Sequence, residues 1–181
     1  DNGCSPEGNF AKLKEFGHDP SAGYRGHKAD IYEGGHRVPF VARWPKGIKP
    51  GQKTTALACL TDLYATMREI TGQPKKDNGG EDSFSLLPAF KGKDKTSRST
   101  LVSHSIGGSF SMRQGDWKLC LSGGSGGWSA PREGDAKKRK LPPMQLYDLK
   151  NDRGERKNLV AEKRSKADEL ILLLSKEVEQ G

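Results

Sequence analysis

Two short segments near the start of the chain hold the side chains best suited to metal and anion chemistry. Asp1 and Asn2 stand side by side and offer a carboxylate and an amide oxygen, the hard ligands that Ca²⁺ or Mg²⁺ takes in proteins. Lys28 offers a compact positive charge on a flexible side chain. Together these residues predict half of an anion-processing metal site, whose other half we expect to lie outside this chain.

The same residues also allow simpler explanations. Asp1-Asn2 directly before Gly3 can form an Asx-type turn that needs no metal. Lys28 can be one exposed lysine among many, and His27 beside it can either donate to an anion or serve a structural role. Spacing alone does not choose between the chemical and the structural explanation.

Composition bounds the class of protein and its partners. The 181 residues include 31 Lys and Arg against 23 Asp and Glu, which gives a net charge of +8. Such a surface suits nucleic acid, anionic lipid or sulfated glycan, or is simply a solvated basic surface. The 32% hydrophobic content, with 23 Gly and 10 Pro, predicts a modest core with long loops, or a piece of a larger protein. No apolar run approaches membrane-spanning length, and no two of the three Cys stand at zinc-ligand spacing.

Three further features leave alternatives open. The run Lys137–Lys140 (KKRK) can be a patch for nucleic acid or glycan, or a solvated loop. Trp128 can be a platform for a sugar ring or can pack back on the sheet. For Glu33 and Arg37 we expect a buried structural ion pair or hydrogen bonds to nearby loops.

The elements that must position these residues follow from hydrophobic periodicity and turn signals. Strands are expected at Arg37–Trp44, Ser99–Ser103, Ser109–Leu121 and Gln145–Leu149, helices at Thr61–Thr71 and Ala161–Glu179, and one helical turn within Phe84–Phe90. Residues 1–36 and 123–140 are expected to be loops, the second of them mobile. An antiparallel sheet with a packed C-terminal helix follows, an arrangement of the α+β kind.

Two of these elements have a clear pattern. Trp117, Leu119 and Leu121 alternate with Lys118 and Cys120, the period-two pattern of a half-buried strand. The helix at 161–179 places its apolar residues at i, i+3 and i+4 spacing along one face. We therefore expect the strand to bury its apolar face and the helix to pack along its apolar stripe.

The chain resembles the C-terminal portion of type I sulfatases, the arylsulfatase A-like branch of the alkaline phosphatase superfamily. The segments that carry the resemblance are DNG at Asp1, GHKADIYEGGHRVPFVARWP at Gly26–Pro45, TDLYATMREITG at Thr61–Gly72, DSFSLLPAFKG at Asp82–Gly92, MRQGDWKL at Met112–Leu119 and LYDLKNDRGERKNL at Leu146–Leu159. They occur in the family's order and span nearly the whole chain. The resemblance implies an α/β plus α+β fold. Residues 1–80 would complete the large α/β catalytic domain, and residues 81–181 would form a small α+β subdomain.

The resemblance also implies an activity and its cofactors. The family hydrolyses sulfate esters with a formylglycine nucleophile, made from the Cys of a C-x-P-S-R motif, and with a Ca²⁺ ion, for which Mg²⁺ is the alternative. On this match Asp1 and Asn2 are metal ligands, and Lys28 is a catalytic residue that contacts the sulfate and its bridging oxygen. The chain departs from the pattern because it has no C-x-P-S-R motif; Cys4-Ser5-Pro6 continues with Glu7 and Gly8. The formylglycine is therefore expected in the missing N-terminal part of the same sulfatase, and the isolated chain is expected to be inactive.

The substrate is expected to be a sulfated carbohydrate or an aryl sulfate. His27 and His104 are candidate substrate contacts; for His104 the alternative is a loop hydrogen bond. The resemblance further implies a periplasmic or secreted protein with no membrane or nucleic-acid partner. Two alternatives remain: a phosphodiesterase or phosphonate hydrolase of the same superfamily, or a non-catalytic basic module that binds anionic polymers.

Overall fold

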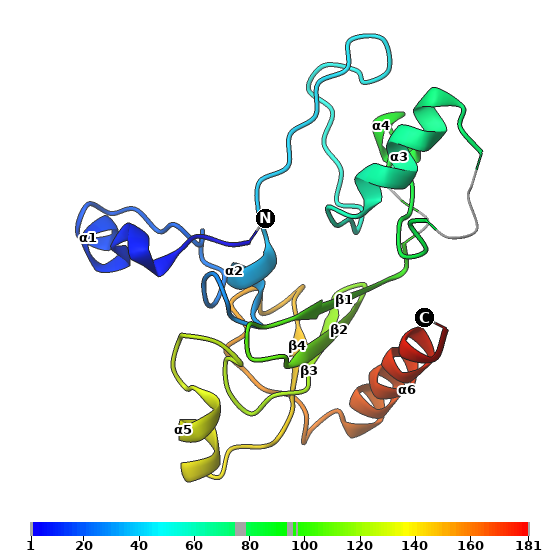
Figure 1. Ribbon diagram of the computed structural model, residues 1–181. Helices are drawn as coiled ribbons and strands as arrows, with labels where there is room; N and C mark the ends of the chain where they lie inside the picture. Colours follow the sequence, from blue (N-terminus) through cyan, green and yellow to red (C-terminus); the bar gives the residue numbers. More distant parts are fainter. Residues whose placement is uncertain (1, 75–78, 94–95, 97, 181) are drawn as a thin grey trace. The chain divides into compact units, whose positions relative to one another are not determined.

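The computed structural model describes residues 2–74, 79–93, 96 and 98–180 (Figure 1). The chain divides into two compact units. The first contains residues 1–39 and 102–180, and the second contains residues 40–101. The predicted boundary at residues 80 and 81 concerns the domains of a complete enzyme and stays a prediction.

A four-stranded sheet forms the centre of the first unit. Its strands β1 (Thr100–His104), β2 (Phe110–Gln114), β3 (Trp117–Cys120) and β4 (Gln145–Asp148) lie in the order β1-β2-β3-β4. The strand β3 pairs antiparallel with both β2 and β4. The chain reverses between β2 and β3 at Gly115, whose φ of 57° lies in the left-handed region that glycine adopts without strain. The predicted turn and antiparallel sheet are confirmed.

One face of this sheet is covered by α6 (Arg164–Gln180), as Figure 1 shows. Met112, Leu119 and Leu146 form an apolar cluster with Leu170 and Leu174 of the helix, all of them buried. The i, i+3, i+4 stripe of α6 is the face that makes these contacts. The predicted packed C-terminal helix is confirmed.

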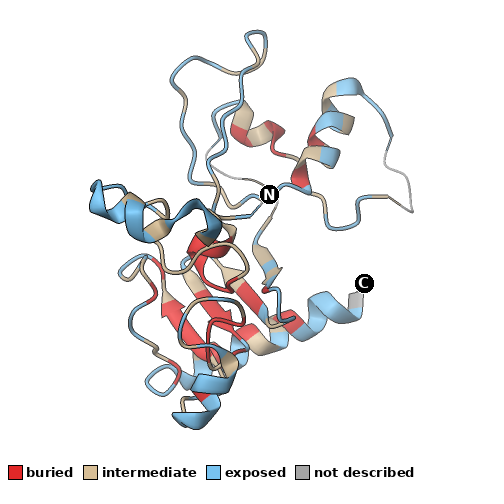
Figure 2. Ribbon diagram, turned by 60° about the vertical axis from the view of Figure 1, so that its left-hand side comes forward, coloured by how far each residue is buried: buried red, intermediate tan, exposed pale blue. Residues whose placement is uncertain are grey.

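The opposite face of the sheet is covered by residues from the N-terminal part of the chain. The short helix α2 (Glu33–His36) follows Ile31 and Tyr32, which pack with Cys120 and Tyr147. Figure 2 shows buried residues both on the sheet and in α2. Lys118 is only 2% exposed. The prediction that the strand is half-buried is therefore wrong, because a segment about 85 residues away in sequence buries its polar face as well.

The second unit contains α3 (Asp62–Thr71) and α4 (Leu87–Phe90). The helix α3 ends at Gly72 with φ 68°, as its sequence predicts. Asp62 is fully buried, and its carboxylate accepts from the backbone of Cys59 and Phe84 and from the Arg98 guanidinium. This ion pair, rather than an apolar stripe alone, fixes the start of α3.

Three sequence predictions of local structure are wrong. Residues 37–44 form no strand, because an extended segment needs a neighbouring backbone to bond and this one lies outside the sheet. Residues 1–36 are not only loop, since Pro6–Gly8 form a 3₁₀ turn and α1 spans Phe10–Glu15. Residues 123–140 contain a further helix, α5 (Glu133–Lys138), and many hydrogen bonds.

The three thiols, Cys4, Cys59 and Cys120, are free. None of the helices in the described part of the chain is both long and apolar enough to cross a membrane.

The packing of α6 gives a direct test of this fold. Leu170 is fully buried against the sheet, so Leu170→Ala should lower the free energy of unfolding by about 2–5 kcal/mol through lost burial and a residual cavity. Leu172 lies on the same helix but is 63% exposed, so Leu172→Ala should change the free energy of unfolding by no more than about 0.5 kcal/mol. Chemical denaturation of both variants measures the two values. Equal losses would contradict the orientation of α6.

Candidate functional site

The segment that contains Asn2 lies against the loop that carries Lys28. The Gly3 amide donates to the Gly35 carbonyl at 2.9 Å, and the Lys28 amide donates to the Cys4 carbonyl at 3.0 Å. A Cβ on Gly3 would collide with the Gly34 carbonyl, so only glycine permits this approach. The structure thus brings the backbones of two predicted site segments together, while Asp1 lies outside the described residues.

Asp30 holds the Lys28 loop in place. Its buried carboxylate accepts from the His27 amide at 3.0 Å, from the Trp128 amide at 2.8 Å and from the Ser129 amide at 3.0 Å. The Ser129 hydroxyl donates to the same carboxylate. Asp30 therefore connects the Lys28 loop to residues 128–129. Sequence reasoning missed this role, because only the fold shows which distant amides meet the carboxylate.

The backbone beside Lys28 is strained. Ala29 has φ 84°, a conformation that a residue with a Cβ rarely adopts. Its carbonyl accepts from the Ile106 amide at 3.0 Å, and this bond, with those of Asp30, holds the loop against the strain. Local strain of this kind costs about 1–3 kcal/mol and often accompanies functional loops.

The Lys28 side chain is half-buried and makes no hydrogen bond or ion pair with the described residues. The neighbouring His27 ring packs 5.5 Å from the Phe10 ring, with Nδ1 lying 3.0 Å from the Lys28 carbonyl oxygen and 3.6 Å from an Asp30 oxygen. No described residue occupies the Lys28 ammonium, which is therefore available to bind an anion. The His27 ring, in contrast, already contacts Phe10, the Lys28 carbonyl oxygen and Asp30.

An open cavity of about 560 Å³ lies beside this loop. His27 lines it together with the cationic Lys14, Arg25 and Arg156, the carboxylate of Asp19 and the ring of Tyr24. Cations outnumber carboxylates in this lining, so the cavity suits an anionic or strongly hydroxylated ligand more than an apolar one.

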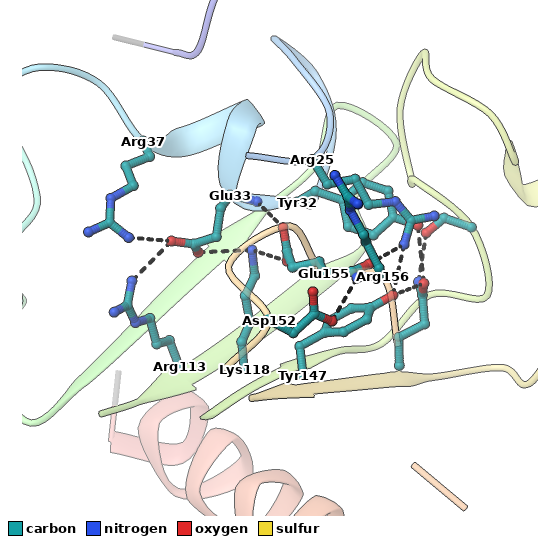
Figure 3. Close-up of polar contacts among 12 residues, drawn as sticks. Arg25, Tyr32, Glu33, Arg37, Arg113, Lys118, Tyr147, Asp152, Glu155 and Arg156 are labelled. Carbon is teal, nitrogen blue, oxygen red and sulfur yellow. Dashed lines mark hydrogen bonds and ion pairs between the residues drawn. The ribbon is translucent and has the colours of Figure 1, made fainter. Parts of the chain in front are cut away.

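Glu33 is the centre of a buried ion network (Figure 3). Its carboxylate lies 3.1 Å from the Lys118 ammonium, 3.0 Å from Arg113 and 3.1 Å from Arg37. The expected pair with Arg37 forms, but it is buried only at its Glu33 end, since the Arg37 side chain is 47% exposed. The Lys118 ammonium also lies 3.1 Å from Glu155, so one lysine joins two carboxylates.

The network changes the acidity of its members. Burial alone would raise the pKa of Glu33, but the Lys118, Arg113 and Arg37 cations outweigh it and lower the pKa to about 2. Burial raises the pKa of Glu155 more than Lys118 lowers it. Burial would lower the pKa of Lys118, but the two carboxylates raise it above its ordinary value. Glu33 and Lys118 therefore remain a charged pair over a wide range of pH.

Glu155 also fixes the backbone of α2. Its second oxygen accepts from the Glu33 amide at 2.7 Å. Arg25 donates to the Glu155 carbonyl at 2.8 Å and to the Tyr147 hydroxyl at 3.0 Å (Figure 3). The 146–159 segment thus holds both ends of the loop that contains Lys28. Sequence reasoning did not single out Glu155, which appeared only within the LYDLKNDRGERKNL segment that carries the family resemblance.

Two other histidines are His104, the last residue of β1, and His36, the last residue of α2. His104 is exposed, its Nδ1 lies 3.0 Å from the Ser105 carbonyl oxygen, and its ring lies 6.2 Å from Phe110. Burial and the nearby Lys118 charge lower the pKa of His36 to about 4, and its Nε2 has no hydrogen-bond partner in the described part of the chain. The predicted substrate contacts of His104 and His27 stay predictions.

The residues that the structure describes do not complete a metal site by themselves. The described residues contain no group of three or more His, Cys, Asp or Glu arranged to hold a metal ion. Asn2 and Asp1 could supply two oxygens, whereas Ca²⁺ usually takes 6–8. Any cation at Asn2 therefore needs most of its ligands from elsewhere.

Removing the shared cation should destabilise the fold strongly. Lys118→Met would leave Glu33 and Glu155 buried without their common partner, which should lower the free energy of unfolding by about 3–5 kcal/mol. Lys157→Met, which breaks an exposed pair with Glu162, should cost at most about 1 kcal/mol. Urea denaturation of both variants compares the two pairs. A loss for Lys118→Met no larger than for Lys157→Met would show that the buried network does not stabilise the fold.

The network should also make the free energy of unfolding depend on pH. An unfolded chain protonates Glu33 at a pH of about 4.5, whereas the folded state keeps it ionised to a pH of about 2. Ionised Glu33 therefore stabilises the fold above pH 4.5, and this contribution is lost as the pH falls towards 2. The gap in unfolding free energy between the wild type and Glu33→Gln should narrow across this window. A gap independent of pH would contradict the lowered pKa.

The amino-acid sequence of the chain is similar to the sequences of known sulfatases. No protein-family model matches the chain. The chain is 32% identical over 161 residues to an N-acetylgalactosamine-6-O-sulfatase of Bacteroides thetaiotaomicron, covering 87% of the chain and 30% of that relative. It is 33% identical over 144 residues to arylsulfatase A of Homo sapiens, covering 74% of the chain and 28% of that relative.

Solved structures agree with these relatives. One solved structure is described for the metabolism of multiple glycosaminoglycans by Bacteroides thetaiotaomicron. It superposes with a TM-score of 0.76 and 31% sequence identity, covering 92% of the present chain and 34% of that structure's chain. Another was solved in complex with its substrate D-glucosamine-2-N,6-O-disulfate. It superposes with a TM-score of 0.63 and 25% sequence identity, covering 83% of the present chain and 30% of that structure's chain. The chain thus spans about a third of the length of the proteins that it matches.

Proposed function

Because this chain belongs to the sulfatase family of the alkaline phosphatase superfamily, we propose that it is the C-terminal part of an enzyme that hydrolyses sulfate esters. The observation that carries the proposal is the Lys28 loop. A cation without a partner in the described part of the chain lies on a strained loop, which is bonded on one side to the segment of Asn2 and on the other to Asp30.

The arrangement suits the chemistry of sulfate transfer. Negative charge gathers on the non-bridging oxygens and on the leaving oxygen as the ester bond breaks. Lys28 would bind the sulfate and stabilise the leaving oxygen, because a fixed ammonium group needs no reorganisation during the reaction. Asp30 would act as a positioning residue, since its hydrogen bonds hold the loop rather than touch the sulfate.

Two further parts of the site would come from outside this chain. Membership of the family implies a metal ion and a formylglycine in the full enzyme. Asp1 and Asn2 would contribute oxygens to a Ca²⁺ site, with Mg²⁺ as the alternative, and this ion would polarise the sulfate. The N-terminal part of the same protein would supply the remaining ligands and the nucleophile, and the isolated chain would be inactive.

A sulfated carbohydrate is the substrate class that we favour over an aryl sulfate. The open cavity beside His27 is lined by cations and by the Tyr24 ring, which suits a sugar with anionic groups. Two of the similar proteins are described with sulfated amino sugars: the N-acetylgalactosamine-6-O-sulfatase and the structure that contains glucosamine disulfate. On the same grounds we propose a periplasmic or extracellular enzyme, where such glycans occur.

The role of Lys28 can be tested in the full-length enzyme. Lys28→Ala should lower turnover of a small aryl sulfate by about 10²–10³-fold, because a preorganised charge at the transition state is lost. Lys12→Ala removes an equal charge from the exposed face of α1 and should leave turnover unchanged. Steady-state kinetics, with thermal unfolding as a control for folding, separates the two variants. Unchanged turnover in a folded Lys28→Ala enzyme would exclude Lys28 from the mechanism.

A further inference from the structure

Four consecutive cations, Lys137, Lys138, Arg139 and Lys140, are all exposed at the end of α5. We call these residues the basic turn. None of the four lies within ion-pair distance of a carboxylate in the described part of the chain, whereas the exposed Lys157 and Arg164 and the partly buried Lys166 all do. The basic turn therefore presents positive charge that no carboxylate among the described residues neutralises.

The two acidic residues of α5 lie in the first turn of the helix and accept hydrogen bonds there. Glu133 accepts from the Gly124 amide at 3.0 Å and from the Ser122 hydroxyl. Asp135 accepts from the Arg132 amide at 3.3 Å. These contacts separate the acidic start of the helix from its basic end, so the positive charge is concentrated on one turn.

The basic turn is held in a fixed conformation. Ala136 is 2% exposed and anchors the helix on the rest of the first unit. The amides of Arg139, Lys140 and Leu141 donate to carbonyls three to five residues earlier at 2.9–3.0 Å. A preformed turn loses less conformational entropy on binding than the mobile loop that the sequence predicts.

A short path connects the basic turn to the Lys28 loop within the same unit. Asp30 binds the amides of Trp128 and Ser129, and the Arg132 side chain donates to the Trp128 carbonyl at 3.1 Å. Arg132 in turn directly precedes α5. By the reach of these residues the basic turn lies within about 30 Å of Asp30. A polymeric ligand longer than this distance is long enough to reach from the Lys28 loop to the basic turn.

We propose that the basic turn is an accessory binding surface for a sulfated polysaccharide and holds the polymer while one sulfate group lies at Lys28. The proposal rests on the function proposed above and extends it from a small sulfate ester to a polymer. Clustered cations bind such a polyanion mainly by releasing its counterions, which makes the binding sensitive to salt. Single-stranded nucleic acid is a poorer match, because it is usually bound by cations interleaved with aromatic rings, and KKRK contains none.

The test compares two charge-matched variants of the full-length enzyme. One replaces Lys137, Lys138, Arg139 and Lys140 by Gln. The control replaces Lys157, Lys163, Arg164 and Lys166 by Gln, three of which are paired with acidic residues. The first variant should elute from immobilised heparin at clearly lower salt, with a slope of log Kd against log salt reduced by about three. The control should elute close to the wild type.

Kinetics supply the second measurement. With a sulfated polysaccharide as substrate, the basic-turn variant should show KM raised about tenfold at unchanged kcat, while turnover of a small aryl sulfate stays the same. Equal losses of heparin binding in both variants would overturn the proposal, because net charge alone would then explain them. Tighter binding of the wild type to single-stranded DNA than to heparin would also overturn it, in favour of a nucleic-acid surface.

The outcomes separate this proposal from the one on which it rests. An enzyme that hydrolyses no sulfate ester, yet loses heparin binding only in the basic-turn variant, would overturn the proposed activity and retain the anionic-polymer surface. An enzyme that hydrolyses sulfate esters, and whose basic-turn variant binds heparin and polymer as the wild type does, would retain the activity and reject the surface.

Discussion

The fold of the first unit depends on one buried cation. The Lys118 ammonium lies between the carboxylates of Glu33 and Glu155 and joins α2, the strand β3 and the 146–159 segment. Each of these charges would be costly to bury alone, so each requires the other two in place. Arg113 and Arg37 complete the pairing of Glu33. Three segments far apart in sequence are thereby fixed in one arrangement.

The backbone of the candidate site is held in place by this network. Glu155 holds the backbone of α2, and α2 in turn receives the Gly3 amide through the Gly35 carbonyl. Asp30 then ties the Lys28 loop to residues 128–129. Lys28 is therefore placed by a chain of buried hydrogen bonds rather than by its own side-chain contacts. A strained residue such as Ala29 persists only where the surrounding structure is so firmly fixed.

The two faces of the sheet are covered by different kinds of contacts. The face under α6 is apolar, while the opposite face packs Cys120 and Tyr147 against Ile31 and Tyr32 and binds α2 through the ion pair of Lys118 with Glu33. This division explains why residues 1–39 pack with residues 102–180 as one unit. In the proposed enzyme, the small antiparallel sheet would thus support the sulfate site directly, rather than being an appendage to it.

The sequence by itself determined what depends on neighbours along the chain. The periodicity of α6, the glycine that ends α3 and the turn at Gly115 are local signals, and the spaced motifs indicated the family. Only the tertiary structure decided that Lys118 is buried, that Asp30 holds the Lys28 loop and that residues 37–44 form no strand. Each of these depends on a partner that is distant in sequence or absent from the sheet. A period-two pattern records which side chains share a face of a strand, but whether a distant carboxylate covers that face is decided by long-range packing.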